Sequence, residues 1–180
     1  MKTINDILKI FPCTKAEEWK QHDKGKGWVQ ITAYVEATAT IMGVVYGNAQ
    51  VSDNAQVYGN ARVFGDTLVF GDTRVSDNAQ VYGDALVYGN ARVYGDALVY
   101  GNTWVSGSAQ VSDNAQVSGD AQLSGNAWVY GDARVSGSAR VSGDARVSGS
   151  AQLSGDAQVY GDAQLSGNAQ FSGSDVWGSR

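Results

Sequence analysis

An apolar residue recurs at every sixth position from residue 45 to residue 171, which gives 22 consecutive hexads. Their consensus is V-[YS]-G-[ND]-A-x, as in VYGNAR at residues 57–62. Two earlier hexads begin at Val29 and Val35, and the segment from Ile41 then falls two residues short of a full repeat. A period of six does not match the 3.6-residue turn of an α-helix, and Gly in each repeat would cost a helix about 1 kcal/mol relative to Ala. The repeat therefore excludes a helical fold.

Each hexad instead predicts a short strand and a corner. Because side chains alternate between faces along a strand, the Ala and the Val of one Ala-x-Val-x segment point to the same side. The Gly-Asn or Gly-Asp pair that follows is a strong turn signal, since these residues tolerate positive φ. Asp53, Asp77 and Asp113 replace Gly in three hexads and are expected to adopt the same corner conformation. The chain should thus coil around an interior of Val and Ala.

The number of residues per coil is left open by periodicity alone. Residues 81–92 and 93–104 echo each other at a distance of 12, whereas Tyr46, Phe64, Tyr82 and Tyr100 are spaced by 18. Both distances are multiples of six. The pattern of an aliphatic residue with a small residue four positions later resembles the hexapeptide-repeat family, and in particular the highly regular A-x-V-x-G-[ND] repeat proteins of bacteria and phages. This resemblance implies a left-handed parallel β-helix with about three hexads per coil.

Residues 1–28 have a different composition and are predicted to form a helical N-terminal cap on a β-helix of residues 29–180. All six lysines of the chain lie in this segment. Apolar residues recur with helical spacing from Ile4 to Phe11, and Pro12 should end that helix. Thr14 and Glu17 are interpreted as a capping box that opens a second short helix carrying Trp19. A cap here would cover the apolar interior and unpaired strand edges at the end of the coil.

Charge and hydropathy restrict the classes of partner. The net charge of −5 argues against nucleic acid, which requires clustered Lys and Arg. No stretch approaches the ~18 apolar residues of a membrane span, and the N-terminus lacks the continuous apolar segment of a signal peptide. We therefore expect no membrane partner and a cytoplasmic location in a bacterial or phage-infected cell.

Enzymatic chemistry finds no support in the repeats. The hexapeptide-repeat family includes acyltransferases that use a His base at a subunit interface and carbonic anhydrases that bind zinc through three His. This chain has one His, His22, which precedes the repeats and is interpreted as a solvated residue at a helix end. The aspartates at the corners are interpreted as turn residues, so we expect no catalytic residues, metal or cofactor.

Aromatic residues that follow the repeat Val are the strongest signal for binding. Eight such positions in the N-terminal half are Tyr or Phe, whereas the corresponding positions from 106 to 124 are all Ser. These side chains should point outward, either to stack on each other or to form a binding surface. With three hexads per coil, one face would hold a contiguous apolar group bordered by polar residues. The predicted partner-binding residues are Leu68, Phe70, Leu86, Tyr88 and Trp104, together with Tyr46, Phe64, Tyr82 and Tyr100.

The leading hypothesis from sequence is a nonenzymatic scaffold, a rigid rod whose N-terminal coils bind a protein partner or another copy as a dimer or trimer. One alternative is an enzyme that resembles the acyltransferases. The other is an acidic rod that mimics DNA to inhibit a nuclease or a defence complex. Between residues 45 and 180 the chain has 13 Asp and 7 Arg, which is a weak charge for DNA mimicry.

Overall fold

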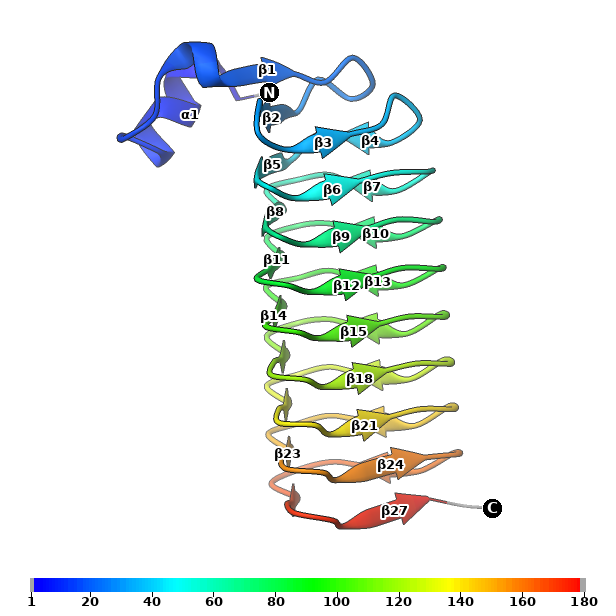
Figure 1. The fold of residues 1–180 in the computed structure, drawn as a ribbon. Helices are drawn as coiled ribbons and strands as arrows, with labels where there is room; N and C mark the ends of the chain where they lie inside the picture. The colour runs from blue at the N-terminus through cyan, green and yellow to red at the C-terminus, as the bar shows by residue number, and fades with distance from the viewer. Residues whose placement is uncertain (1, 179–180) are drawn as a thin grey trace.

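The structure is a computed structural model that describes residues 2–178, and its dominant feature is a stack of similar coils (Figure 1). It confirms a parallel β-solenoid of about eight turns with one short α-helix. The N-terminal segment lies at one end of the stack, and the last described strand lies at the other (Figure 1). The strands form three sheets that run along the length of the rod.

The first sheet contains ten strands and includes the only antiparallel pair found among residues 2–178, β1 with β2. Its strands, in spatial order, are β1 (Trp19–Gln21), β2 (Trp28–Gln30), β5 (Val44–Gly47), β8 (Arg62–Gly65), β11 (Gln80–Tyr82), β14 (Leu98–Tyr100), β17 (Gln116–Val117), β20 (Arg134–Val135), β23 (Gln152–Leu153) and β26 (Gln170–Phe171).

The second sheet contains nine strands, all parallel. They are β3 (Tyr34–Val35), β6 (Gln50–Val51), β9 (Leu68–Val69), β12 (Leu86–Val87), β15 (Trp104–Val105), β18 (Gln122–Leu123), β21 (Arg140–Val141), β24 (Gln158–Tyr160) and β27 (Val176–Gly178).

The third sheet contains eight parallel strands. They are β4 (Thr40–Ile41), β7 (Gln56–Val57), β10 (Arg74–Val75), β13 (Arg92–Val93), β16 (Gln110–Val111), β19 (Trp128–Val129), β22 (Arg146–Val147) and β25 (Gln164–Leu165).

The pairing register is constant along the regular part of the rod. Val81 is the partner of Val63 on one side and of Val99 on the other, so each counterpart is the Val of the third hexad away in the sequence. The first coil is shorter. Val29 pairs with Val45, 45 − 29 = 16 residues later, whereas Val81 pairs with Val99, 99 − 81 = 18 residues later. This difference matches the two residues missing from the repeat that begins at Ile41.

The strands contain two to four residues and are mostly shorter than the four-residue segments predicted from the repeat. The Ala that precedes each strand nevertheless takes part in the ladder between coils. For example, the Leu68 N–H donates to the Ala85 carbonyl oxygen at 2.9 Å. Backbone hydrogen bonds between coils also continue through the corners, where for example the Asp66 N–H donates to the Gly83 carbonyl oxygen at 2.9 Å.

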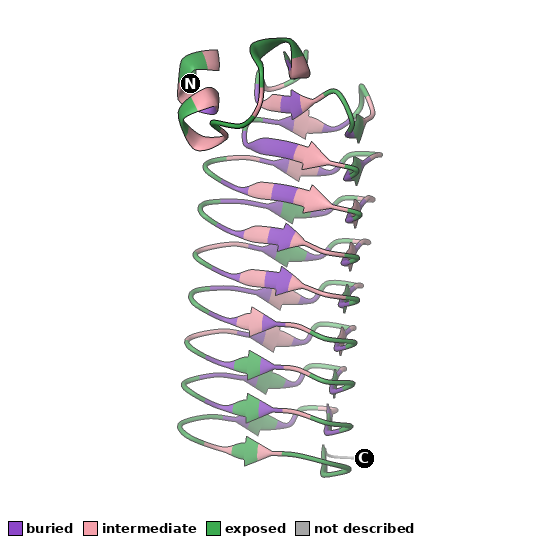
Figure 2. Ribbon diagram, turned by 60° about the vertical axis from the view of Figure 1, so that its left-hand side comes forward, coloured by how far each residue is buried: buried purple, intermediate pink, exposed green. Residues whose placement is uncertain are grey.

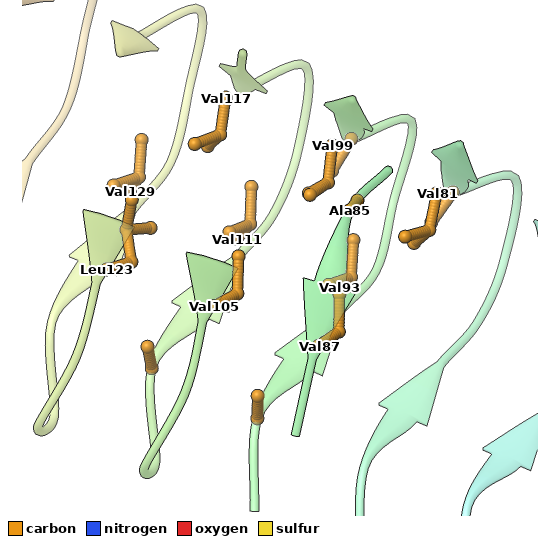
Figure 3. Packing of buried hydrophobic residues seen from close by; sticks show 14 of the residues in the cluster. Val81, Ala85, Val87, Val93, Val99, Val105, Val111, Val117, Leu123 and Val129 are labelled. Carbon is orange, nitrogen blue, oxygen red and sulfur yellow. The ribbon is translucent and has the colours of Figure 1, made fainter. Parts of the chain in front are cut away.

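Val and Ala fill the interior as the repeat predicts (Figure 3). Side chains such as Val81, Val93 and Val105 point into the coil from different sheets and are fully buried. One continuous cluster of buried apolar residues extends from Val29 to Leu165. Three Ala positions hold Thr instead, and the Thr67 hydroxyl donates to the Phe64 carbonyl oxygen at 2.7 Å. Burial colours in Figure 2 show the same alternation of inner and outer positions along the strands.

Successive corners approach each other closely, and at Gly positions an added side chain would meet the backbone of the next coil. Gly137 has a φ of +67°, and a Cβ atom on it would lie 2.7 Å from the Gly155 nitrogen. Asp77 at a Gly position has a φ of +60°, and Asp53 and Asp113 are similar, which confirms that they adopt the corner conformation. The Asp77 carboxylate accepts a hydrogen bond from the Gly95 N–H of the next coil at 3.2 Å. Asp at these positions therefore adds a bond between coils that Gly cannot make.

The N-terminal helix α1 (Ile4–Ile10) forms as predicted from its apolar spacing. Thr3 caps it, since its hydroxyl accepts from the Asp6 N–H and the Asp6 carboxylate accepts from the Thr3 N–H. Hydrogen bonds from the Thr3 backbone and side chain lower the pKa of Asp6. The buried side chain of Ile7 connects the helix to a small apolar cluster with Trp19 and Val44.

The predicted second helix is wrong in extent and in position. Only a single 3-10 turn, η1 (Ala16–Glu18), is present, and Trp19 lies on strand β1. Thr14 does not cap this turn. Its hydroxyl donates to the Phe11 carbonyl oxygen and accepts from the Trp19 indole N–H at 3.0 Å. Pairing of β1 with the edge of β2 and burial of Trp19 outweigh the local helix signal.

His22 is a buried residue of the cap and not a solvated residue at a helix end. Its ring nitrogens lie 3.0 Å from the Lys24 carbonyl oxygen and 3.1 Å from the Glu36 carbonyl oxygen. The Lys24 ammonium donates to the Thr38 carbonyl oxygen at 2.7 Å. Two of these contacts, those to Glu36 and Thr38, satisfy backbone groups of the first coil, which has no further coil above it.

We predict that Val93→Asp unfolds the coils around it. The change removes about 1.5–3 kcal/mol of apolar burial and places a carboxylate in an interior without a partner. Circular dichroism during thermal melting should show a large loss of stability. Gln152→Asp, at an exposed outward position of another coil, is the control and should melt within about 0.5 kcal/mol of the unmutated protein. Native-like melting of Val93→Asp would contradict the assignment of this Val row to the interior.

A second prediction separates the cost of corner conformation from the cost of coil contact. Gly137 and Gly167 have φ values of +67° and +68°, but a Cβ on Gly167 would meet no atom within 4 Å. Gly167→Ala should cost no more than the roughly 1–2 kcal/mol of a left-handed Ala. Gly137→Ala should cost distinctly more, because the next coil must also move. Equal losses in denaturant unfolding would show that contact between corners is unimportant.

Candidate interaction surface

Five of the predicted binding residues lie together on the second sheet. Leu68, Leu86 and Trp104 occupy equivalent positions on β9, β12 and β15 and are direct partners in the pairing register. Phe70 and Tyr88 follow two of these strands, and their rings stack with centroids 5.2 Å apart and planes 10° from parallel. We call these five residues the apolar patch.

The apolar patch is less exposed than its sequence suggests. Trp104 is 48% exposed, whereas Leu68, Phe70, Leu86 and Tyr88 are half-buried. Each of the half-buried side chains is covered in part by the equivalent side chain of a neighbouring coil. The patch therefore offers the outer edges of stacked side chains around one exposed indole.

Polar residues continue the same columns toward the C-terminus. Gln122 pairs with Trp104 and then with Arg140, while Ser106 and Ser124 follow the corresponding strands. A flat apolar surface that ends in a polar border has the arrangement usual at protein interfaces.

The other four predicted residues lie on a different sheet and form a continuous ring stack. Tyr46, Phe64, Tyr82 and Tyr100 lie on β5, β8, β11 and β14, with ring centroids 4.6, 4.8 and 5.0 Å apart. Phe11 of the cap extends the stack by packing edge-on against Tyr46 at 4.7 Å. The structure thus does not place all nine residues on one surface. Tyr46 connects the cap to this stack, and the other three rings continue it along the rod.

Burial in this stack changes the acidity of two tyrosines. Desolvation raises the pKa of Tyr46, against a smaller opposing effect of the Arg62 charge. Desolvation also raises the pKa of Tyr82, and the neighbouring Tyr100 adds to the increase. Both shifts favour the neutral phenol that the stacked geometry accommodates.

Sequence reasoning missed exposed apolar residues on the first coil. Tyr34, on β3 of the second sheet, is 58% exposed, and Met42, after β4, is 60% exposed. Tyr34 lies in the same column as Leu68, with Gln50 between them. Its position before Val35 in an early hexad was the available signal. On this sheet the predicted surface began only at Leu68.

Between residues 2 and 178, no group of three or more His, Cys, Asp or Glu side chains is arranged to hold a metal ion. Within the same range, no helix has the length and apolar character needed to cross a membrane.

The ring stack predicts a loss of stability in alkali. Folding raises the pKa values of Tyr46 and Tyr82 above the value of about 10 in unfolded chains. The stabilisation of the fold that these shifts contribute is therefore present below pH ~10 and is lost as the pH rises through the folded-state values. Melting temperature should therefore fall above pH ~10, and should fall less for Tyr46→Phe/Tyr82→Phe. Phenolate absorbance should show late-titrating groups that this variant lacks. An unchanged titration would contradict the pKa shifts.

Comparison with known proteins agrees with the repeat architecture. A family model described as the YdcK beta solenoid repeat matches eight overlapping or neighbouring segments, which together cover more than half of the chain. They are residues 55–77, 73–89, 79–93, 91–107, 109–125, 121–137, 127–141 and 139–155. No curated protein matches the chain. The matched segments contain the central strands and corners described above, and the chain belongs to the YdcK beta solenoid repeat family.

Proposed function

We propose that this protein is a nonenzymatic interaction scaffold, a rigid β-solenoid rod that binds a protein partner or another copy through the apolar patch. The observation that carries the proposal is the contiguous column of Leu68, Leu86 and Trp104 on three paired strands. A stiff sheet holds these side chains in place before binding, so little conformational entropy is lost at the interface. Burial of Trp104 and its neighbours would supply the apolar core of such an interface.

The proposal includes the finer geometry implied by the hexapeptide-repeat resemblance, a left-handed coil with three hexads per turn. Two observations support three hexads per turn. Each regular strand pairs with the equivalent strand of the third hexad away, and the strands divide into three sheets. A rod of this kind presents three flat faces. One or two further copies that used this face would form a closed dimer or trimer.

The absence of an enzymatic role is also part of the proposal. The repeats contain neither His nor Cys, and both ring nitrogens of His22 lie within hydrogen-bonding distance of backbone carbonyl oxygens in the cap. A general base needs a nitrogen that can reach a substrate proton. The contacts of His22 give it a structural role that accounts for its position.

The corner aspartates favour a scaffold over an acidic DNA mimic. At several corners an Asn side chain donates to the Asp of the next coil, as Asn48 does to Asp66 at 2.9 Å and Asn126 to Asp144 at 2.7 Å. These amides partly offset the charge of the carboxylates that they contact, although each of these two Asp is followed by another Asp at the equivalent corner of the next coil. Such a pattern stabilises the stack and gives a diluted negative charge.

Replacing Phe70 and Leu86 by Glu should disrupt the assembly and leave the coils folded. Two carboxylates within the apolar patch would have to be desolvated without partners on binding. Light scattering coupled to gel filtration measures the mass of the unmutated protein and of Phe70→Glu/Leu86→Glu, and circular dichroism checks the fold. We expect a dimer or trimer to become a monomer.

The matched control is Gln122→Glu/Ser124→Glu, which adds the same charge to the polar continuation of the same sheet. It should retain the mass of the unmutated protein. If the unmutated protein is a monomer at tens of micromolar, self-association is wrong, and the patch must then bind a different protein. A double variant that retains the unmutated mass in an oligomer would contradict the role of the patch.

A further inference from the structure

The third sheet contains a ring column with gaps, unlike the continuous stack on the first sheet. The residues that follow β7, β10, β13, β16 and β19 are Tyr58, Ser76, Tyr94, Ser112 and Tyr130. Tyrosine thus alternates with serine from one coil to the next. Each serine places a short side chain between two tyrosine layers, and the neighbouring side chains largely cover both Ser76 and Ser112.

The gap at Ser112 is closed by another ring. The Trp128 indole N–H donates to the Ser112 hydroxyl at 3.1 Å, and the indole packs on Tyr130 with centroids 4.5 Å apart. The equivalent residue for the gap at Ser76 is Arg92, which has no ring to place there. Tyr94 is directed away from Ser76, because its hydroxyl donates to the Gln110 side chain on the following coil at 3.3 Å.

An open hollow of about 250 Å³ lies over Ser76, which is buried at its floor and only 7% exposed. Its walls are Tyr58, Tyr94, Arg74 and Arg92, together with Asp77 and Gln110. Tyr58 and Tyr94 follow strands that are two layers apart, or ~9.6 Å. Rings on neighbouring coils of this protein stack with centroids 4.6–5.2 Å apart. A planar ring at the level of Ser76 would therefore lie about one stacking distance from each tyrosine layer.

Two unpaired cations lie beside this hollow. Arg74 and Arg92 are direct partners on β10 and β13, an arrangement in which like charges oppose each other. Neither guanidinium makes an ion pair or side-chain hydrogen bond with any residue between 2 and 178. The nearby Asp77 carboxylate is engaged by the Gly95 N–H and the Ser76 hydroxyl. An anion between the two guanidiniums would relieve their repulsion and accept bidentate hydrogen bonds.

Both arginines also line a second, polar hollow of about 280 Å³ together with Gln56, Asp72 and Asn90. The guanidiniums thus lie between an aromatic hollow and a polar one. This order suits a molecule with a flat apolar part, a negative charge next to it and a polar extension.

We propose that the third sheet binds a small ligand that consists of a planar aromatic ring and an anionic group, such as a nucleoside monophosphate or an aromatic carboxylate. The ring occupies the layer of Ser76 between Tyr58 and Tyr94. The anionic group lies between Arg74 and Arg92. This site is on a different sheet from the apolar patch and does not depend on it.

Isothermal titration calorimetry with four probes tests the proposal: AMP, adenosine, inorganic phosphate and 2-naphthoate. AMP or 2-naphthoate should bind saturably, and the tighter of the two identifies the source of the anionic group. Adenosine and phosphate each lack one half of the ligand, and each should bind at least about tenfold more weakly. The proposal is overturned if neither aromatic anion binds at millimolar concentration, or if phosphate alone binds as tightly.

Variants locate the binding on the protein. Ser76→Phe should place the protein's own ring in the hollow and weaken binding at least about tenfold. Because Ser76 is buried, circular dichroism must first show that this variant stays folded. Ser118→Phe, next to Tyr100 on the first sheet, is the matched control and should bind as the unmutated protein does. Unchanged affinity in Ser76→Phe would assign the ligand to another place and overturn the site.

The arginine pair provides a test that does not depend on how the Phe variant folds. Arg92→Gln changes an exposed side chain and should weaken binding of the aromatic anion at least about tenfold while adenosine binding is unchanged. Arg134→Gln removes an exposed arginine from the first sheet and should have no effect. Equal losses from Arg92→Gln and Arg134→Gln would indicate general charge attraction and overturn the site.

Discussion

Hydrogen bonding between consecutive coils at a constant register is the constraint on which the rest of the structure depends. Because Val81 pairs with both Val63 and Val99, every side chain of the regular coils lies directly between its own counterparts on the coils before and after it. The same register brings Gly137 and Gly155 so close that only the backbone fits between them. Interior, corners and faces are therefore all columns of equivalent residues, and the identity of one residue matters through its neighbours in the column.

This arrangement has opposite consequences for different side chains. Rings gain from identical neighbours, as Phe64 and Tyr82 do in their stack, because flat faces at the spacing of the strands are in contact. Charges lose from identical neighbours, and Asn48 above Asp66 shows how a neutral donor reduces that cost on one side of a carboxylate. Arg74 and Arg92 oppose each other directly. Their other strand partners, Gln56 and Gln110, are neutral, but among residues 2–178 they make no hydrogen bond with the guanidiniums. A column that keeps an unfavourable pair without a partner in the chain is a reason to look for a ligand.

The repeat made the regular part of the fold predictable, because each hexad carries the same information about strand, corner and interior. The buried Val and Ala rows and the corner conformation of Asp77 followed from it. The cap did not, because it occurs once and its form depends on tertiary contacts. Trp19 leaves a locally helical segment to pair β1 with β2, and His22 is buried against backbone carbonyl oxygens that the sequence does not identify.

Prediction of the surface succeeded in part for a related reason. Leu68, Leu86 and Trp104 occupy equivalent positions in every third hexad, which places them in one column. The sequence spacing does not show how far these stacked side chains cover each other. The hollow at Ser76 could not be predicted from spacing. It depends on the side-chain direction of Tyr94, which bonds to Gln110, and on Arg92 at the position that Trp128 occupies two coils later. In a rod whose interior scarcely varies, differences between coils lie almost entirely in the outward columns. Specific binding must therefore be encoded where those columns depart from the repeat, and the alternation of Tyr and Ser on the third sheet is such a departure.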